Sequence, residues 1–208
     1  MKITDVVDKV WVTNLARRTD RLATVTKELA KHGIPFEKWV AHDHLNTDKS
    51  AMWWRTYNLK NQLKEAKYRG YKSVLLLDDD TYFCKDFADK FADLWKQIPL
   101  DWDAVSLASI FWQSVASQEF VTPSVIRSYQ SWGAHATIVK DTVYDDFLNA
   151  LTGEEWCDVE LAYLHPYINY YVAYPSLVGQ RAGHSDLQNR HLINEHYGIE
   201  RHEDDNKN

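Results

Sequence analysis

The sequence predicts an α/β protein with a mostly parallel central sheet and flanking helices. Two observations support this fold class. Segments with strand character alternate along the chain with amphipathic helical segments, which is the order of parallel strands joined by crossover helices. In addition, residues 74–77 form an uninterrupted apolar run, Val-Leu-Leu-Leu, which is typical of a strand covered on both faces of a sheet.

The length and composition favour a single globular unit. The chain has 208 residues, of which 45% are apolar and 26% are charged. This length can bury one sizeable core but is short for two. We expect one domain over residues 1–199 and a frayed polar tail over residues 200–208. The net charge of −6 disfavours a surface that grips nucleic acid non-specifically.

Targeting and redox features favour a cytoplasmic protein. No long apolar run follows Met1, so we expect no signal peptide. No segment reaches the roughly 20 apolar residues that a membrane span requires. The two cysteines, Cys84 and Cys157, belong to no paired motif, and we expect both to be reduced thiols.

The first half of the chain predicts three strands separated by two helices. The strands are expected at residues 9–15, 36–40 and 73–77, and the helices at residues 19–32 and 50–69. Thr19 is the expected N-cap of the first helix, and Gly33 and Gly70 mark the ends of the two helices. This order predicts parallel pairing of the three strands.

The second half continues the alternation with one long interruption. Helices are expected at residues 87–98, 143–151 and 156–164, and strands at residues 103–108, 135–139 and 168–173. Residues 109–131 have moderate strand character, contain Pro123 and are too long for a plain connector. A segment of this kind is typical of a lid, a binding loop or an irregular hairpin. We interpret it as a lid.

Three adjacent carboxylates, Asp78, Asp79 and Asp80, follow the apolar strand directly. Adjacent anions repel one another, and a divalent cation that joins them is a simple physical reason for their presence. In open α/β sheets the carboxyl ends of the strands are also where ligands bind. An acidic turn that caps the next helix is the alternative interpretation.

A basic corner lies between the first strand and the first helix. It consists of four side chains, Asn14, Arg17, Arg18 and Arg21. The free backbone N–H groups of a helix N-terminus favour anions, and arginine binds phosphate through paired hydrogen bonds, so this corner suits a phosphorylated ligand. The alternative is a solvated first turn in which Asp20 pairs with a neighbouring arginine.

Common motifs of other α/β enzymes are absent from the sequence. It contains no Gly-x-Gly-x-x-Gly after the first strand and no Gly-x-x-x-x-Gly-Lys, which disfavours a dinucleotide dehydrogenase and a P-loop nucleotidase. It also contains no Gly-x-Ser-x-Gly and no His-Glu-x-x-His, the motifs of α/β-hydrolases and zinc proteases.

Four short motifs and one aspartate occur in a fixed order between about residue 10 and residue 187. They are Asn14-Leu15-x-Arg17-Arg18-x-Asp20-Arg21, Leu75-Leu76-Leu77-Asp78-Asp79-Asp80, Gly133-Ala134-His135-Ala136, Asp158, and Pro175-x-Leu177-Val178-x-Gln180 followed by Ser185-Asp186. In this order and spacing they resemble glycosyltransferase family 25, which contains lipooligosaccharide galactosyltransferases and collagen galactosyltransferases.

The resemblance implies the nucleotide-diphospho-sugar transferase fold of the GT-A type. It also implies an inverting glycosyltransferase that depends on a divalent cation, Mn²⁺ or Mg²⁺. The donor would be a nucleotide-diphosphate sugar such as a UDP-sugar, and the transferred unit a hexose, either galactose or glucose. The acceptor hydroxyl would belong to a glycan, a hydroxylated side chain or a modified base in nucleic acid.

The resemblance and the chemistry of such a transfer suggest a role for each motif residue. Asp78 and Asp80 would hold the cation, with His184 as a further ligand because imidazole suits manganese. Asp158, with Glu160 second, would take the proton of the acceptor hydroxyl as it attacks. The donor would contact Asn14, Arg17, Arg18, Arg21, Asp79, Gly133 and Gln180, and the acceptor would contact Trp132, Ser185 and Asp186.

The sequence departs from the pattern of the family at three places. Asp78 stands where the family has glutamate, residues 53–58 replace a Cys-x-x-Ser-His stretch, and the family does not require the insert Arg181-Ala182-Gly183-His184 before Ser185-Asp186. We expect the segment 109–131 to recognise the acceptor. We interpret the His42-Asp43-His44 cluster as loop residues that cap the next helix. Two alternative functions stay open, a non-catalytic module that binds a nucleotide-sugar or glycan, and a sugar-nucleotidyltransferase.

Overall fold

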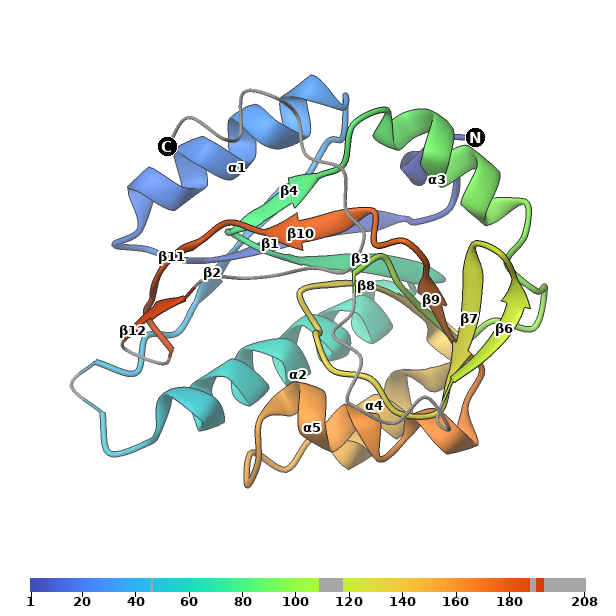
Figure 1. The fold of residues 1–208 in the computed structure, drawn as a ribbon. Helices are drawn as coiled ribbons and strands as arrows, with labels where there is room; N and C mark the ends of the chain where they lie inside the picture. The colour runs from blue at the N-terminus through green and yellow to red at the C-terminus, as the bar shows by residue number, and fades with distance from the viewer. Residues whose placement is uncertain (46, 109–117, 188–189, 193–208) are drawn as a thin grey trace.

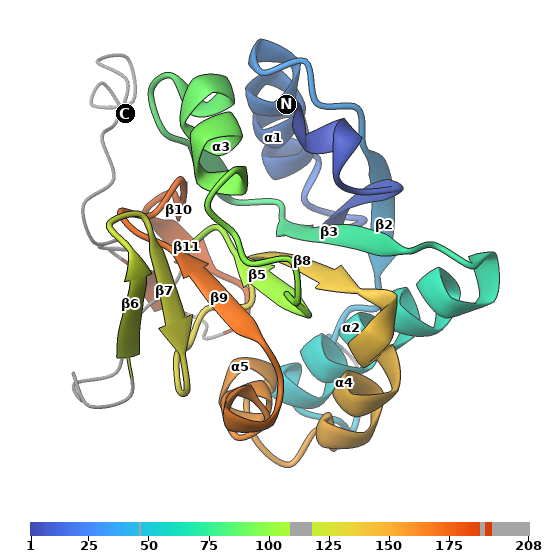
Figure 2. The same ribbon diagram turned by 90° about the vertical axis from the view of Figure 1, so that its right-hand side faces the viewer.

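The fold is built on one large sheet between two layers of helices (Figures 1 and 2). The computed structural model describes residues 1–45, 47–108, 118–187 and 190–192. The sheet contains β1 (Lys9–Leu15), β2 (Glu37–Ala41), β3 (Ser73–Asp78), β5 (Ala104–Ser106), β6 (Gln118–Thr122), β7 (Val125–Ser128), β8 (Ala136–Lys140) and β9 (Tyr170–Ala173). Helices α1 (Thr19–Lys31) and α3 (Phe87–Trp95) cover one face, and α2 (Ala51–Arg69), α4 (Tyr144–Ala150) and α5 (Cys157–Ala162) cover the other.

The sheet is mixed, but most of its strands run in one direction. The strand order is β2-β1-β3-β8-β5-β9-β7-β6. β1 is parallel to β2 and β3, and β5 is parallel to β9. β8 is antiparallel to β3 and β5, and β7 is antiparallel to β9 and β6. Of these eight described strands only β7 and β8 run against the others, which confirms the predicted mostly parallel sheet.

Strand β3 is buried on both faces, as its apolar run predicts. Val74 and Leu76 pack into the core beneath α2, α4 and α5, whereas Leu75 and Leu77 pack into the core beneath α1 and α3. None of the four is more than 4% exposed. A slip of one residue would exchange the two sets of side chains between the cores, so the packing fixes the register of β3. The register in turn fixes the position of Asp78 at the end of the strand.

The structure confirms Gly70 as the end of α2, shows a cap at Ser50 that was not predicted, and differs from the prediction at Thr19. At the start of α2 the Oγ of Ser50 accepts a hydrogen bond from the Trp53 amide at 3.1 Å, and Gly70 ends the helix with φ of 70°. Thr19, however, is not the N-cap of α1. Arg18 occupies that position without a capping hydrogen bond from its side chain, and Thr19 is the first helical residue.

Residues 109–131 are only partly described, because residues 109–117 lie outside the described ranges. The described remainder forms the hairpin β6–β7 at the far edge of the sheet, which is one of the structures that the segment predicts. The predicted tail 200–208 also lies outside the described residues. The domain boundary at residue 199 therefore stays a prediction.

Short strands that the sequence did not predict form two small ribbons beside the main sheet. β4 (Thr81–Phe83) and β10 (Val178–Gln180) form an antiparallel ribbon, and β11 (Gly183–Ser185) pairs with β12 (Arg190–Leu192). In the first ribbon Gly179 lies opposite Tyr82, and a Cβ at Gly179 would come within 2.5 Å of the Tyr82 ring. Only a glycine fits there. The 3₁₀ helices among the described residues are η1 (Ile3–Asp5), η3 (Asp141–Val143) and η4 (His165–Tyr167).

Two further predictions concern cysteines and membrane spans. Cys84 and Cys157 are both buried, and neither is part of a disulfide. Within the described ranges, none of the helices has the length and apolar character needed to cross a membrane.

Candidate active site

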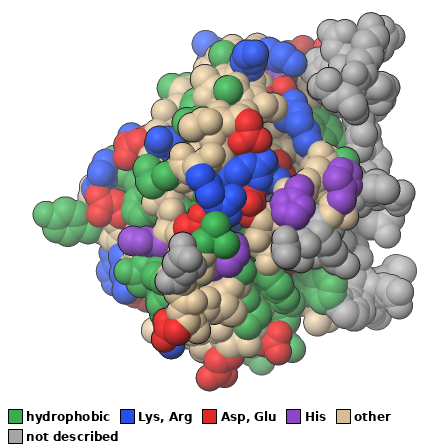
Figure 3. Space-filling model, turned by 90° about the vertical axis from the view of Figure 1, so that its left-hand side faces the viewer, with side chains coloured by type: hydrophobic (Ala, Val, Ile, Leu, Met, Phe, Trp, Pro, Cys, Tyr) green, Lys and Arg blue, Asp and Glu red, His purple; other side chains and the backbone are tan. Residues whose placement is uncertain are grey.

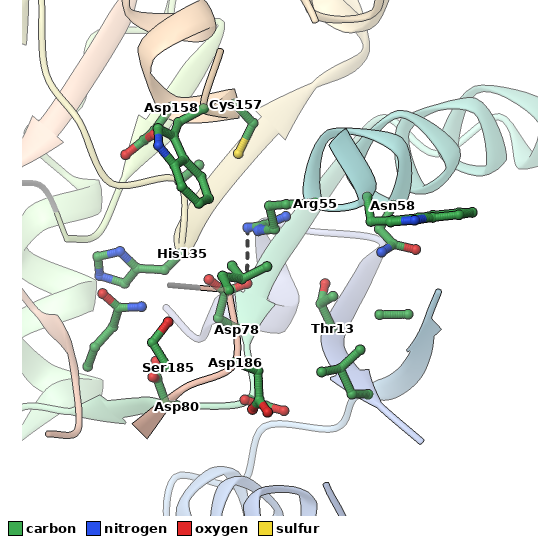
Figure 4. Close-up of a pocket in the computed structure, with 18 of the residues that line it drawn as sticks. Thr13, Arg55, Asn58, Asp78, Asp80, His135, Cys157, Asp158, Ser185 and Asp186 are labelled. Carbon is green, nitrogen blue, oxygen red and sulfur yellow. Dashed lines mark hydrogen bonds and ion pairs between the residues drawn. The ribbon is translucent and has the colours of Figure 1, made fainter. Parts of the chain in front are cut away.

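A cavity of about 420 Å³ opens at the edge of the sheet where β1, β2 and β3 end (Figure 4). β8 runs antiparallel to β3, so the segment that leads into it, residues 132–135, reaches the same edge. The cavity therefore lies outside the carboxyl ends of parallel strands, where α/β sheets bind ligands. Its remaining walls come from α2, α5 and the segment 181–187, which we call the C-terminal strap.

The acidic triplet forms the floor of the cavity, and each of its carboxylates has a different environment. Asp78 accepts a hydrogen bond from Arg55 Nη2 at 3.0 Å. Asp79 accepts one from Arg21 Nη1 at 3.0 Å and one from Asn14 Nδ2 at 2.7 Å. Two of the three carboxylates are therefore already neutralised by arginine.

Asp80 forms a longer ion pair with the same Arg21 that binds Asp79. Its Oδ2 lies 3.5 Å from Arg21 Nη1, but its Oδ1 is buried and has no hydrogen-bond partner among the described residues. Burial and the neighbouring charge of Asp78 raise the pKa of Asp80 to about 6, although Arg21 opposes the shift. Burial also raises the pKa of Asp79, against the opposing effects of Arg21 and Asn14. A cation beside Asp80 would satisfy the free oxygen and relieve this repulsion.

The donor set suits a cation that is shared with a substrate. In the described ranges no group of three or more His, Cys, Asp or Glu side chains is arranged to hold a metal ion. Mg²⁺ and ions like it are commonly bound through one or two carboxylates together with substrate phosphates. Asp80, with its unpartnered oxygen, fits that arrangement. His184 is exposed and does not line the cavity, and its carbonyl oxygen accepts a 2.6 Å hydrogen bond from Arg21.

The basic corner is largely occupied by carboxylates of the chain itself. Arg17 binds Asp43 at 2.6 Å and Asp186 at 2.7 Å, and Arg18 binds Asp186 and Asp20. On the face of the molecule that Figure 3 shows, positively and negatively charged side chains lie next to one another near the middle. Asp20 therefore pairs locally with Arg18, as the alternative interpretation predicts. In addition, Arg17 and Arg18 hold the C-terminal strap through Asp186.

Of the four residues of the basic corner, only Arg21 lines the cavity. Asn14 is buried beneath it, where its amide supports Asp79 and donates to the carbonyl of Arg18 at 3.0 Å. Gly133, Gln180, Trp132, Ser185 and Asp186 also line the cavity, as their predicted contacts with donor and acceptor require.

Asp158 lies across the cavity from the triplet, in the first turn of α5 (Figure 4). Its Oδ2 accepts a hydrogen bond from the Gly133 amide at 3.2 Å, and its Oδ1 accepts one from the Val159 amide at 3.1 Å. Gly133 has φ of 97°, a conformation that L side chains rarely adopt. The glycine therefore presents its amide to the carboxylate and fixes the direction in which Asp158 points.

Glu160, the second candidate base, does not line the cavity. It is 7% exposed, and its Oε1 accepts hydrogen bonds from the backbone amides of residues 152–155 and from the Thr152 hydroxyl. The carboxylate thus holds together the loop before α5. Its position supports a structural role and leaves Asp158 as the candidate base that faces the cavity.

Several residues line the cavity without having been predicted to do so. They include His42 and His44, which the sequence analysis interpreted as capping the next helix, whereas Ser50 caps α2. His42 and Trp54 form a stacked pair with ring centroids 5.4 Å apart, and together with His44 they line the wall next to β2. Asn58 fixes this wall, because its side chain exchanges hydrogen bonds of 2.9 and 3.2 Å with the backbone of His42. The departure of residues 53–58 from the family pattern was the available signal for this wall.

Arg55, Trp156 and Cys157 also line the cavity without having been predicted to do so. Burial raises the pKa of the Cys157 thiol to about 12, so the thiol is neutral at physiological pH. For Arg55, burial disfavours the charged form, but the effects of Asp78, Cys157 and Asp158 together outweigh burial and raise the pKa above its ordinary value. The described side chains 118–131 do not line the cavity, and residues 109–117 lie outside the described ranges, so recognition of the acceptor by this segment stays a prediction.

Comparisons with known proteins identify the fold. No protein-family model and no curated protein matches the sequence. Among solved structures, the chain is similar to a glycosyltransferase involved in the glycosylation of the major capsid of PBCV-1. The TM-score is 0.52 and the identity 14%, over 87% of this chain and 95% of that one. This likeness supports the predicted α/β fold of the GT-A type, whereas membership of family 25 stays a prediction.

Two further structures are similar at lower scores. One is the catalytic domain of Drosophila β1,4-galactosyltransferase 7 in complex with xylobiose, with a TM-score of 0.47, 9% identity, and coverage of 82% of this chain and 68% of that one. The other is mannose-1-phosphate geranyltransferase from Thermus thermophilus, with a TM-score of 0.43, 9% identity, and coverage of 79% and 72%.

Proposed function

We propose that this protein is an inverting, metal-dependent glycosyltransferase. It moves a hexose, galactose or glucose, from a nucleotide-diphosphate sugar such as a UDP-sugar to an acceptor hydroxyl. One observation carries the proposal: a single cavity in a GT-A type fold has arginine-flanked carboxylates on one side and the half-buried carboxylate of Asp158 on the other. The first side suits a diphosphate and its cation, and the second suits a base.

The metal in this proposal is Mn²⁺ or Mg²⁺. Asp80 is its main protein ligand because its buried Oδ1 has no other partner among the described residues, and Asp78 is the second carboxylate that the sequence suggests. The bound ion would neutralise charge on the departing diphosphate. Asp79 is held by Arg21 and Asn14 and therefore keeps the triplet in place.

Asp158 acts as the general base. The oxygen of the acceptor hydroxyl attacks the anomeric carbon of the sugar while Asp158 takes its proton, and the bond from that carbon to the diphosphate oxygen breaks with its electron pair. Attack from the side opposite the diphosphate inverts the anomeric configuration. The position of Asp158 across the cavity from the triplet supports this arrangement (Figure 4). The hydrogen bond from the Gly133 amide keeps the carboxylate oriented.

The acceptor is a glycan, a hydroxylated side chain or a modified base, each of which offers a hydroxyl group. Trp132, Ser185 and Asp186 line the cavity and are the proposed acceptor contacts. Trp132 offers an aromatic ring to a sugar or a base. The net charge of −6 disfavours nucleic acid as the acceptor.

A donor screen tests the proposal. Thermal unfolding of the full chain is followed with UDP-, GDP- and TDP-sugars, each with Mn²⁺ and with EDTA, and hydrolysis of each donor is measured in parallel. We expect one donor to raise the Tm, with a larger rise in Mn²⁺, and to be hydrolysed slowly. The Asp145→Asn variant is a control, because Asp145 is exposed and pairs with Lys67 on the surface.

Each outcome of this screen discriminates between functions. Stabilisation by a nucleotide-sugar without hydrolysis, and without transfer to any acceptor tested, would indicate a binding module. Formation of a nucleotide-sugar from a sugar phosphate and a nucleoside triphosphate would indicate a sugar-nucleotidyltransferase. If no donor stabilises the chain in either condition, the glycosyltransferase proposal is wrong.

A further inference from the structure

Arg55 is a buried cation in the wall of the cavity. It lies in the second turn of α2, and its side chain is 11% exposed. Its Nη2 donates to Asp78 Oδ1 at 3.0 Å, whereas its Nη1 is buried and has no hydrogen-bond partner among the described residues. A buried charged donor without an acceptor costs free energy, and a ligand with an acceptor oxygen would recover that cost.

The surroundings of Arg55 indicate what kind of ligand would bind it. Arg55 and Arg21 are the only Arg or Lys side chains among the described residues that line the cavity. Arg21 is engaged by Asp79, by the carbonyl of His184 and, at 3.5 Å, by Oδ2 of Asp80. Arg55 lies between Asp78 and the α5 side of the cavity (Figure 4), so an anion bound to its Nη1 would lie between the triplet and Asp158. Paired phosphate oxygens match the geometry of a guanidinium.

The ion pair with Arg55 also changes the expected role of Asp78. A guanidinium at 3.0 Å competes with a divalent cation for the same carboxylate and repels it electrostatically. Asp80 has an oxygen without a partner among the described residues, but Asp78 already holds Arg55. The sequence assigns Asp78 and Asp80 to one metal, but only Asp80 has a buried oxygen that is available to bind it.

We propose that Arg55 binds the diphosphate of the donor through Nη1 and that Asp78 is the residue that positions its guanidinium. The inference rests on the proposed function, because it takes the ligand to be a nucleotide-diphosphate sugar. In this arrangement the cation would be held by Asp80 and by the phosphates of the donor, and not by Asp78. Arg55 would then neutralise part of the charge on the leaving diphosphate, and a cation held by Asp80 would neutralise a further part.

Binding of nucleoside diphosphates without metal isolates the contribution of Arg55. UDP, GDP, ADP and TDP are titrated into the full-length wild type in EDTA and in Mn²⁺, and the tightest of them is compared with its nucleoside. For Arg55→Gln we expect the Kd of the diphosphate in EDTA to rise about 10-fold or more, while the Kd of the nucleoside is unchanged. Arg55→Lys keeps the charge but loses the paired geometry, and we expect an intermediate Kd.

The matched control is Arg69→Gln on the same helix. Arg69 forms an exposed ion pair with Glu65, and we expect this variant to bind the diphosphate like the wild type. Arg55→Gln leaves Asp78 without its partner and can destabilise the fold. The double variant Arg55→Gln/Asp78→Asn keeps a neutral pair at these positions, and we expect it to bind as weakly as Arg55→Gln.

The ratio of the Kd in EDTA to the Kd in Mn²⁺ separates the two aspartates. We expect Asp78→Asn to weaken binding in EDTA but to leave this ratio unchanged. For Asp80→Asn we expect a ratio of about one, because Mn²⁺ no longer strengthens binding. If Arg55→Gln binds as tightly as the wild type, or if Asp78→Asn loses the metal effect alone, the inference is overturned and the transferase proposal stands. If the wild type binds none of the diphosphates, the proposed glycosyltransferase function is wrong, and the inference about Arg55 is rejected with it.

Discussion

Arg17 and Asp186 lie 169 residues apart in the chain and form an ion pair of 2.7 Å. Arg17 belongs to the turn between β1 and α1, and Asp186 belongs to the C-terminal strap. Arg18 binds the other oxygen of the same carboxylate. The strap is thereby tied to the turn that precedes α1, and it closes one side of the cavity.

The first prediction concerns this tie. Asp186→Asn removes the charge that both arginines bind, and exposed or partly exposed ion pairs contribute about 0.2–1 kcal/mol each. We expect amide hydrogen exchange within residues 183–187 to become about 3- to 10-fold faster, with little change elsewhere. Asp93→Asn, which removes an exposed pair with Lys96, serves as the control. Unchanged exchange of the strap would show that the two arginines do not hold it.

The second prediction separates Asp158 from Glu160. Asp158→Asn keeps the shape of the side chain but removes the base, and we expect transfer to fall about 10²- to 10⁴-fold while the Kd of the donor stays within a factor of about three. Glu160→Gln should instead destabilise the fold, because Oε1 collects several amide hydrogen bonds. Calorimetric binding, initial rates and urea unfolding measure the three quantities. Loss of donor binding in Asp158→Asn would reject the role of a base.

The third prediction concerns Gly133, which has φ of 97° and donates its amide to Asp158. An alanine there is strained, and its Cβ would lie 3.3 Å from the His135 ring. We expect Gly133→Ala to lose about 1–3 kcal/mol of stability and to lower kcat more than it raises KM for the donor. Gly70→Ala is the matched control. It carries similar backbone strain at φ of 70° but lies away from the cavity, so kcat should not change.

The fourth prediction uses the pH dependence of stability. Glu28 on α1 is buried, and it accepts hydrogen bonds from the Phe83 amide at 3.0 Å and from Arg181 Nη2 at 2.9 Å. Burial favours the neutral acid, but His32, the Phe83 amide and Arg181 outweigh it and lower the pKa of Glu28 from 4.5 to about 2. The carboxylate therefore stabilises the fold above pH 4.5, and this contribution is lost as the pH falls towards 2.

Glu28→Gln removes this contribution. We expect the variant to unfold with on the order of 3 kcal/mol less free energy than the wild type at pH 7. The difference should shrink between pH 4.5 and pH 2. Urea unfolding of both proteins across this range measures it. Glu65→Gln, which disrupts a surface pair with Arg69, should change stability by less than about 0.5 kcal/mol at any of these pH values. A difference that is constant with pH would contradict the assignment.

The sequence predicts the secondary structure correctly where local sequence signals and the pattern of burial agree. The apolar run 74–77 predicts a strand covered on both faces, and Gly70 predicts the end of α2. The same strand delivers the carboxylates Asp78 and Asp80 to the cavity. These features depend on residues that are close together in the chain, so periodicity and capping rules can identify them.

Features that depend on distant partners could not be predicted in this way. The sequence does not indicate that Arg17 and Arg18 bind Asp186. It also gives Arg55 the appearance of an ordinary helix residue, because its partner Asp78 lies on another element. β10 and β11 have three residues each, and such short strands give too little periodicity to be recognised.

The order of strands in the sheet has a consequence for how the protein is made. β8 lies between β3 and β5, yet it begins at Ala136, long after β3 ends at Asp78. During synthesis the apolar edge of β3 has no partner until this late strand emerges. A chain that stops before residue 140 would present this unpaired edge to other chains, and such edges promote aggregation. The half that carries the acidic triplet can therefore complete its sheet only after the strand that follows Gly133 has been translated.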